Sequence, residues 1–250
     1  MKKGERLKRI RTILGRNKMD IKQEVNQAIV NFLIKTIKEP LISFSEADLQ
    51  QMLVEELHKI KVLSKLYPTS VKRGQNSKSV YSTSLIHREY GAGDKSRIDV
   101  VIFDKEHVRE INDINLTKGK EYLPPLYAFE LGTEKSPDTK NHFQNDFKKL
   151  GNCIKNGYLI HVYKDTTASK SGTGRRENTE KKIEAKFKSI FNKSKPDSKI
   201  KVLAMLLRVY RKQSKIIGKC EIYTHCQESW KKISINGKEK IKEAILGELS

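Results

Sequence analysis

Two acidic residues lie within apolar segments that are predicted to be strands. Asp99 stands in RIDVVIFD, residues 97–104, and Glu130 stands in YAFELGTEKS, residues 127–136. If these segments are antiparallel neighbouring strands, the beginning of the first lies opposite the end of the second, which brings the two carboxylates together. Two carboxylates within ~4 Å repel by roughly 4 kcal/mol at an effective dielectric constant of about 20. A fold that converges them therefore needs a cation or a shared proton.

A divalent metal ion is the cation that such a pair would hold. Carboxylate, carbonyl and water ligands suit Mg²⁺ or Mn²⁺. A metal ion bound there can activate water and neutralise the charge that develops on a phosphodiester. The sequence therefore predicts a Mg²⁺ or Mn²⁺ site at Asp99 and Glu130.

A third carboxylate, Glu56, falls in the middle of the apolar face of a helix predicted over residues 45–66. The apolar residues of that face are Leu49, Met52, Leu53, Leu57, Ile60 and Leu63. A buried carboxylate must be compensated, and a metal ion is one form of compensation. A buried base such as Arg88 or Arg97 is another, and a third is extension of the side chain to an edge of the core. The sequence leaves these alternatives open.

The elements that must position these residues follow from periodicity and turn signals. Ser45 and Asp48 form a capping box that opens the helix of Glu56. Strands are predicted at 80–90, 97–104, 126–131 and 157–164, the first two joined through a glycine-rich turn into a hairpin. A helix opened by Ser136 and Pro137 precedes the last of these strands, so the last two strands are parallel. Another amphipathic helix, 19–38, packs on the core or pairs with a second chain.

The formal charge of +21 is concentrated on the flanks of the chain. Residues 1–40 carry 11 basic and 4 acidic side chains, residues 41–165 carry 19 and 17, and residues 166–250 carry 21 and 9. Basic flanks indicate a polyanionic partner, because each lysine or arginine that neutralises a phosphate releases counterions. A merely soluble lysine-rich surface and an acidic protein partner are the alternatives. An anionic membrane is disfavoured, since the apolar helix faces are sized for a core.

The order of these elements resembles the PD-(D/E)XK nuclease superfamily, which includes many restriction endonucleases. The likeness covers residues 45–165: a helix with an acidic residue, a hairpin, Asp99, Glu130, a lysine, then a helix and a strand. It implies an α/β fold with a restriction-endonuclease-like core, in which helices flank a mixed central sheet. Basic N- and C-terminal extensions would complete this chain.

The resemblance also implies roles for single residues. Asp99 matches the metal-binding aspartate, Glu130 the acidic residue of the E-x-K element, and Glu56 the helix glutamate beside the site. The main-chain carbonyl of Leu131 would be a further metal ligand. The lysine expected two positions after Glu130 is replaced by Gly132.

Two lysines are candidates for the role that Gly132 cannot fill. Lys135 follows the strand on a loop that Gly132 would let curl back, and Lys149 lies on the next helix, away from the centre of its apolar face. Lys135 is the preferred candidate. Its role would be to orient the attacking water and stabilise the charged transition state.

The predicted function is therefore that of a Mg²⁺-dependent endodeoxyribonuclease, of which a restriction-type enzyme is one form. A basic loop with Lys170, Arg175 and Arg176 would hold the DNA backbone. A homodimer would supply two sites for the cleavage of two strands, with the helix at 19–38 as a candidate interface. The alternative is a nucleic-acid-binding protein that keeps this fold and has lost catalysis, which the glycine at position 132 would explain.

Three regions are expected: a basic helical region at 1–40, a nuclease-like core at 41–165 and a basic region at 166–250 that completes the sheet. The chain has no apolar run of the roughly 18 residues that a membrane helix needs, and its lysine-rich start lacks the features of a secretory signal. Three cysteines do not form a full set of disulfides. We expect a soluble, cytoplasmic protein.

Overall fold

Seven strands rich in apolar and β-branched residues form one mixed sheet, in the order β10-β9-β8-β7-β6-β4-β3. The computed structural model describes residues 21–39, 45–73, 77–91, 97–112, 123–134, 142–151, 156–165, 181–186, 188–189, 201–212, 215–226, 229–236, 240 and 242–243. Antiparallel pairs join β3, β4 and β6, parallel pairs join β6, β7 and β8, and β9 and β10 continue antiparallel from β8. The strands of this sheet are β3 (Ile86–Gly91), β4 (Arg97–Ile102), β6 (Tyr127–Glu134), β7 (Asn156–Asp165), β8 (Lys201–Lys212), β9 (Lys215–Cys226) and β10 (Ser229–Asn236).

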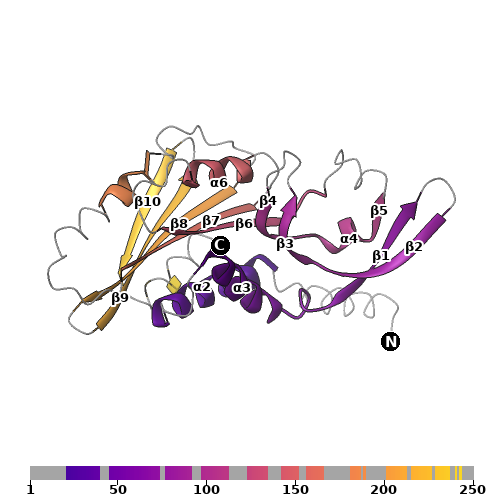
Figure 1. Cartoon of the computed structure of the whole chain (residues 1–250), viewed down its shortest axis with the longest axis horizontal. Helices are drawn as coiled ribbons and strands as arrows, with labels where there is room; N and C mark the ends of the chain where they lie inside the picture. The colour runs from indigo at the N-terminus through magenta and orange to yellow at the C-terminus, as the bar shows by residue number, and fades with distance from the viewer. Residues whose placement is uncertain are drawn as a thin grey trace, which may run out of the picture.

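Helices lie on both faces of this sheet (Figure 1). Helices α2 (Ile21–Lys38) and α3 (Glu46–His58) lie on one face, and α6 (His142–Gly151) lies on the other. The expected α/β class with a mixed sheet flanked by helices is therefore observed. Strands β8 to β10, from the basic C-terminal region, belong to the same sheet as the strands of the middle region.

The apolar face of α2 is buried inside this chain. Its buried residues include Val25, Ala28, Ile29 and Phe32. The helix packs against α3, and its Asn26 side chain accepts a hydrogen bond of 3.1 Å from the Tyr158 hydroxyl on β7. Of the two alternatives for this helix, core packing is the one observed.

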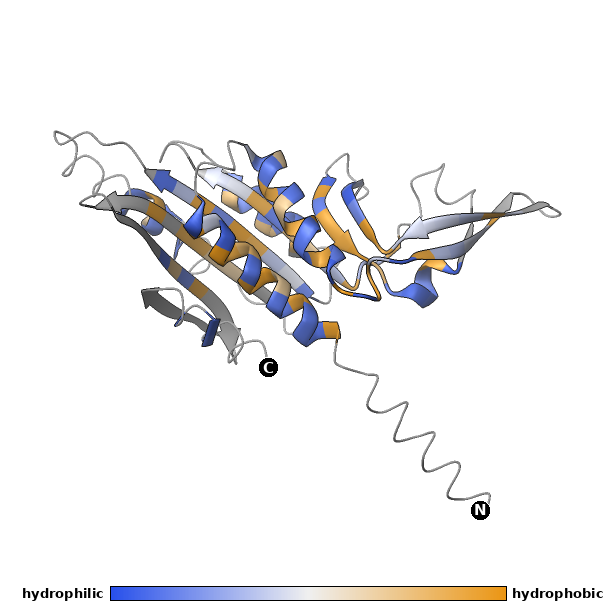
Figure 2. Ribbon diagram, turned by 90° about the horizontal axis from the view of Figure 1, so that it is seen from below, coloured by the Kyte–Doolittle hydropathy of each residue, from blue (hydrophilic) through white to orange (hydrophobic). Residues whose placement is uncertain are grey.

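A second sheet of three strands extends as an arm from the main sheet (Figures 1 and 2). It pairs β1 (Leu66–Arg73) with β2 (Ser77–Ser84) in antiparallel fashion and with β5 (Glu110–Asn112) in parallel. The short helix α4 (Lys105–Val108) precedes β5. The sequence did not predict β1, and it joined β2 and β3 into one strand.

The break between β2 and β3 is held by local hydrogen bonds. The Ser84 hydroxyl accepts a hydrogen bond of 3.0 Å from the Ile86 amide, and the Leu85 carbonyl accepts one of 2.9 Å from the Phe103 amide. The chain therefore leaves the arm at Ser84 and enters the main sheet at Ile86. The prediction of one strand over 80–90 was wrong. The residues before and after the break both suit a strand, so no signal in the sequence marks the break between them.

Helix α3 ends at His58 and not near residue 66 as predicted. Beyond it, the Ile60 amide bonds to the Leu57 carbonyl, and the Leu63 amide bonds to the Ile60 carbonyl. These tight turns keep Ile60 and Leu63 in the core. The helical spacing of apolar residues thus continues past the end of the helix, which is why periodicity overestimated its length.

The register of β4 and β6 sets the geometry of the two carboxylates. Val100 pairs with Phe129, so one further step places Asp99 opposite Glu130. Residues alternate between the faces of a strand, so both carboxylates point away from the face of Phe129. Phe129 stacks on Tyr158, whose hydroxyl donates a hydrogen bond to Asn26 of α2, so Phe129 lies on the face that α2 covers. Asp99 and Glu130 therefore share the face that α6 covers. The predicted convergence of the two carboxylates is observed.

The described helices include none with the length and apolar content to cross a bilayer. Lys170, Arg175 and Arg176, the predicted DNA-contacting residues, lie outside the described residues, as do positions 1–20 of the basic N-terminal region.

We predict that Ser45→Ala weakens the start of α3. The Ser45 hydroxyl accepts a hydrogen bond from the Asp48 amide, and the Asp48 carboxylate accepts one of 2.8 Å from the Ser45 amide. Loss of this cap should lower the free energy of unfolding by about 1 kcal/mol, measured by urea denaturation. Ser82→Ala removes the same atom from an exposed strand position and is the control. Equal effects of the two substitutions would contradict the assignment of the cap.

Candidate active site

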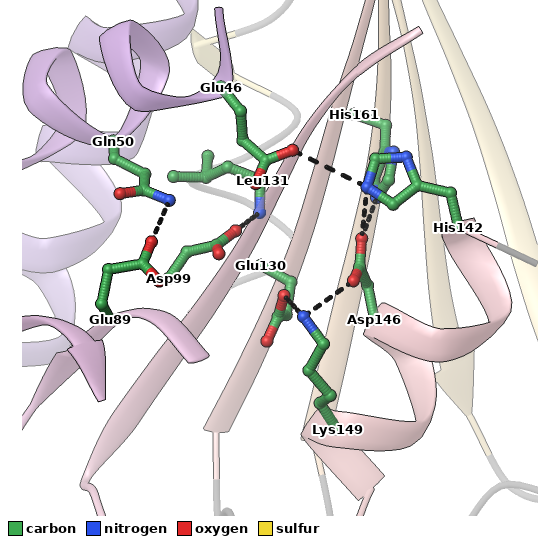
Figure 3. Close-up of polar contacts among 10 residues, drawn as sticks. All are labelled: Glu46, Gln50, Glu89, Asp99, Glu130, Leu131, His142, Asp146, Lys149 and His161. Atoms are coloured by element: carbon green, nitrogen blue, oxygen red, sulfur yellow. Dashed lines mark hydrogen bonds and ion pairs between the residues drawn. The ribbon is translucent and has the colours of Figure 1, made fainter. Parts of the chain in front are cut away.

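Asp99 and Glu130 form the buried centre of the site (Figure 3). Asp99 is 5% exposed and Glu130 is fully buried. The Leu131 amide donates a hydrogen bond of 2.6 Å to Asp99 Oδ2, which fixes the aspartate against the main chain of β6. Glu130 Oε2 lies 2.7 Å from Nζ of Lys149. Within the described part of the chain, Glu130 Oε1 is buried and has no hydrogen-bond partner.

Lys149 supplies the ammonium group of the site from α6. Its Nζ lies 2.7 Å from Glu130 Oε2 and 3.0 Å from Asp146 Oδ1, one turn earlier on the helix. Helix α6 is anchored by the buried residues Phe143 and Leu150, which turn this polar edge toward the sheet. Lys149 was the second candidate for the missing lysine. The preferred candidate, Lys135, lies outside the described residues.

Gly132 is a glycine because two imidazole rings pack against it. A Cβ atom built at this position would lie 2.4 Å from Nδ1 of His161 and 2.9 Å from Cε1 of His142. Real Cβ atoms do not approach other atoms so closely, so a side chain here would have to displace the rings. The position where the resemblance expects lysine is therefore closed by histidine, and the ammonium arrives from α6 instead.

A cluster of His142, Asp146 and His161 lies beside Lys149 (Figure 3). Nε2 of His142 and Nε2 of His161 lie 3.1 and 3.3 Å from the same atom, Asp146 Oδ2. Glu46, the first residue of α3, brings Oε2 to 3.7 Å from Nε2 of His142. Three elements of the fold thus meet at this cluster.

Sequence reasoning passed over His142, His161 and Glu46. Signals for two of them exist. His161 is the one strongly polar side chain within the strand segment GYLIHVY, and His142 precedes Asp146 by four residues, which places both on one helix face. A single histidine in a strand and a polar helix border are common structural features, so neither signal pointed to a site on its own.

Glu56 does not join this site. It is buried as predicted, at 5% exposed, but its Oε1 forms an ion pair of 2.6 Å with Lys59. The pairing base is therefore neither Arg88 nor Arg97. Glu46 is the α3 carboxylate that reaches the cluster, ten residues earlier in the chain, which corresponds to about 15 Å along a helix.

Glu89 on β3 adds a strained backbone position next to Asp99. Its φ is 52°, in the left-handed region that non-glycine residues rarely adopt. In the β3–β4 pairing Arg88 lies opposite Val100 and Tyr90 lies opposite Ile98, so Glu89 lies beside Asp99 between them. Gln50 on α3 donates a hydrogen bond of 3.0 Å to its carboxylate. Strain of this kind is often held at functional sites.

Burial and mutual repulsion determine how these groups titrate. Burial raises the pKa of Asp99 to about 7, although the hydrogen bond from Leu131 opposes the shift. Burial and the negative charge of Asp99 raise the pKa of Glu130 above its ordinary value. Burial also raises the pKa of Glu46. Each of these carboxylates is thus held in an environment that disfavours a second uncompensated negative charge.

Asp146 and Lys149 are shifted in favour of their charged forms. Burial would raise the pKa of Asp146, but His161, His142 and Lys149 together lower it below its ordinary value. Burial would lower the pKa of Lys149, but Glu130 and Asp146 outweigh burial and raise it. The ion pair between Asp146 and Lys149 is therefore maintained at neutral pH.

The arrangement fits a divalent cation bound by oxygen ligands. Burial drives Asp99 and Glu130 toward protonation when no cation is present, and Glu130 Oε1 has no hydrogen-bond partner among the described residues. A hard cation compensates both carboxylates and takes such oxygen ligands. Leu131 meets Asp99 through its amide, and ligation by its carbonyl remains a prediction.

Comparison with known proteins finds no match for this chain. No protein-family model matches it, and neither a curated protein nor a solved structure does.

We predict that the metal-free protein loses stability as pH rises. The folded-state pKa of Asp99 is raised from 3.8 to about 7, so its contribution is fully present below about pH 4 and is lost as pH rises through about 7. The shift corresponds to at most about 4 kcal/mol in the free energy of unfolding. Urea denaturation in a chelator at several pH values, with wild type and Asp99→Asn side by side, measures it.

The contribution of Asp99 to the free energy of unfolding is the difference between the pH profiles of wild type and Asp99→Asn. Asp99→Asn should have the flatter profile, and Mg²⁺ should flatten that of the wild type because it binds the deprotonated form. Parallel profiles for the two proteins would show that Asp99 does not carry the shift.

We predict that Gly132→Ala destabilises the fold by about 1–3 kcal/mol, because the new methyl group must displace the rings of His161 and His142. Gly91→Ala is the matched control, since nothing lies within 4 Å of a Cβ built there. Thermal or urea unfolding compares the two variants. Similar stabilities would mean that the rings do not close this position.

Proposed function

We propose that this protein is a metal-dependent endonuclease that hydrolyses DNA phosphodiester bonds. The observation that carries the proposal is the convergence of Asp99, Glu130 and Lys149 at the pairing of β4 and β6, with Lys149 Nζ 2.7 Å from Glu130 Oε2. Two acids on one sheet face, with a lysine that reaches them from a helix, are the groups that cation-assisted hydrolysis of a phosphodiester requires.

The topology around the site supports a core of the PD-(D/E)XK, restriction-endonuclease-like type. Helix α3 precedes the antiparallel strands β3, β4 and β6, and α6 then leads to β7, parallel to β6. This is the order of elements in the resemblance that the sequence suggested. The acids lie on the second and third of these strands, where that resemblance implies them.

Asp99 and Glu130 would hold Mg²⁺ or Mn²⁺, together with the carbonyl of Leu131. The bound ion would supply a water of lowered pKa and positive charge near the scissile phosphate. Lys149 would position the attacking water and stabilise negative charge in the transition state, in place of a lysine at position 132. Asp146 holds the Lys149 ammonium at 3.0 Å, so it would act as a positioning residue.

The charge of the chain supports a nucleic-acid substrate. The site gathers carboxylates, among them Asp99, Glu130 and Asp146 (Figure 3), while the chain as a whole carries a formal charge of +21. Excess lysine and arginine on the flanks would bind phosphates, including Lys170, Arg175 and Arg176. Cleavage of both strands would use two copies of the site, so we propose a homodimer as the working form.

The test is cleavage of plasmid DNA with Mg²⁺ or Mn²⁺. We expect wild type to nick or linearise the plasmid, and Asp99→Asn, Glu130→Gln and Lys149→Met each to lower the rate by about 10²–10³-fold. Lys148→Met removes a neighbouring exposed lysine of α6 and is the matched control. Comparison of Lys135→Met with Lys149→Met shows which of the two lysines is catalytic, since only loss of that lysine should strongly lower the rate of cleavage.

Binding measured beside cleavage decides between the proposal and its alternative. If wild type leaves the plasmid intact but retards it in a gel, the protein is a nucleic-acid-binding protein without catalysis. If wild type and Asp99→Asn cleave equally, the observed activity comes from another site or from a contaminant. A binding affinity that does not fall with added salt would contradict contact with phosphates.

A further inference from the structure

We propose that His142, His161 and Asp146 form a second metal site, which binds a divalent transition-metal ion such as Zn²⁺, Mn²⁺ or Co²⁺. This site is separate from the oxygen-ligand pair Asp99 and Glu130. The inference goes beyond the proposed nuclease function and does not depend on it.

The distances from Asp146 Oδ2 to the two imidazole nitrogens match those between neighbouring ligand atoms of a coordination shell. Nε2 of His142 and Nε2 of His161 lie 3.1 and 3.3 Å from Asp146 Oδ2, and all three ligand atoms lie within 4.8 Å of one another. Metal–ligand bonds of about 2.0–2.1 Å in a tetrahedral site place neighbouring ligand atoms roughly 3.3 Å apart. Small movements of side chains would therefore admit an ion.

The rings are held in this arrangement by the fold. The two imidazoles meet edge to face, with ring centroids 5.0 Å apart and an interplanar angle of 68°. His161 is fully buried on β7, and both rings pack against the bare Cα of Gly132. The missing side chain at that position is thus what allows both imidazoles to reach one carboxylate oxygen.

The two carboxylate oxygens of Asp146 face different partners, which suits the binding of a cation. Lys149 contacts Oδ1 of Asp146, whereas both imidazole nitrogens face Oδ2, so the carboxylate can hold lysine with one oxygen and a metal ion with the other. Glu46 Oε2, 3.7 Å from Nε2 of His142, is placed to become a fourth ligand. Such an ion would link α3, α6 and β7.

The donor set determines the class of metal. Imidazole nitrogen suits Zn²⁺, Co²⁺, Mn²⁺ and related ions, whereas Mg²⁺ prefers oxygen ligands and retains its waters. The two sites should therefore differ in selectivity, with Mg²⁺ at Asp99 and Glu130 and a transition-metal ion at the histidines.

Titration of the metal-free full-length protein with Co²⁺ tests the proposal. We expect a visible absorption spectrum typical of nitrogen and oxygen ligands, one high-affinity ion per chain, a rise in melting temperature, and retention of Co²⁺ in a large excess of Mg²⁺. His142→Ala and Glu46→Gln change partly exposed residues and should preserve the fold, which circular dichroism checks. His142→Ala should weaken Co²⁺ binding at least about tenfold.

Two further variants make the outcome specific. His107→Ala removes an exposed histidine of α4 and should leave Co²⁺ affinity unchanged. Asp99→Asn should lower Mg²⁺-dependent cleavage by about 10²–10³-fold but retain Co²⁺ binding, so failure of the nuclease proposal and failure of this one are distinguishable. Absence of Co²⁺ binding, equal binding by wild type and His142→Ala, or loss of binding in His107→Ala would each overturn the second site.

Discussion

The structure depends on one electrostatic constraint: acidic side chains are brought together on a buried sheet face where water cannot screen them. Asp99 and Glu130 face each other across β4 and β6, and the fold must compensate their charge. Lys149 provides part of that compensation at 2.7 Å from Glu130. Burial raises the pKa of Asp99 to about 7, so a proton or a further cation would complete the compensation. An unbalanced site of this kind is suited to binding a metal ion, because binding relieves the repulsion.

Gly132 connects the two halves of the site. Its lack of a side chain admits the rings of His161 and His142, at the position where the resemblance seen in the sequence implies a lysine. Helix α6 offsets the loss, since it presents both the lysine that reaches Glu130 and the aspartate that faces the histidines. One small residue thus explains why imidazole nitrogens and carboxylate oxygens lie next to each other, and why the ammonium group comes from a helix and not from the strand.

The positive charge of the chain lies largely apart from the acidic site. The middle region of the chain, residues 41–165, is nearly neutral and contains every residue of the site, whereas the flanking regions hold most of the positive charge. The C-terminal region is joined to the middle region through the sheet, because β8 pairs with β7 along the whole length of β7. A polyanion attracted to the basic regions would therefore meet an acidic centre that is part of the same sheet. That acidic centre would repel phosphate unless cations occupied it, so binding of substrate and of metal should be coupled.

Local pattern in the sequence determined the elements that hold the first two carboxylates. Apolar runs and turn residues predicted the hairpin of β3 and β4 and the following strand, and antiparallel pairing then placed Asp99 opposite Glu130. The capping box of α3 and the burial of Glu56 were also predicted, because both depend on neighbours within one helix. Only the tertiary structure decided that Glu46 and not Glu56 reaches the site, that Lys149 contacts Glu130, and that His161 meets Asp146. Those contacts join residues on different elements, and periodicity states which face of an element is buried but not which charged group from another element will lie against it.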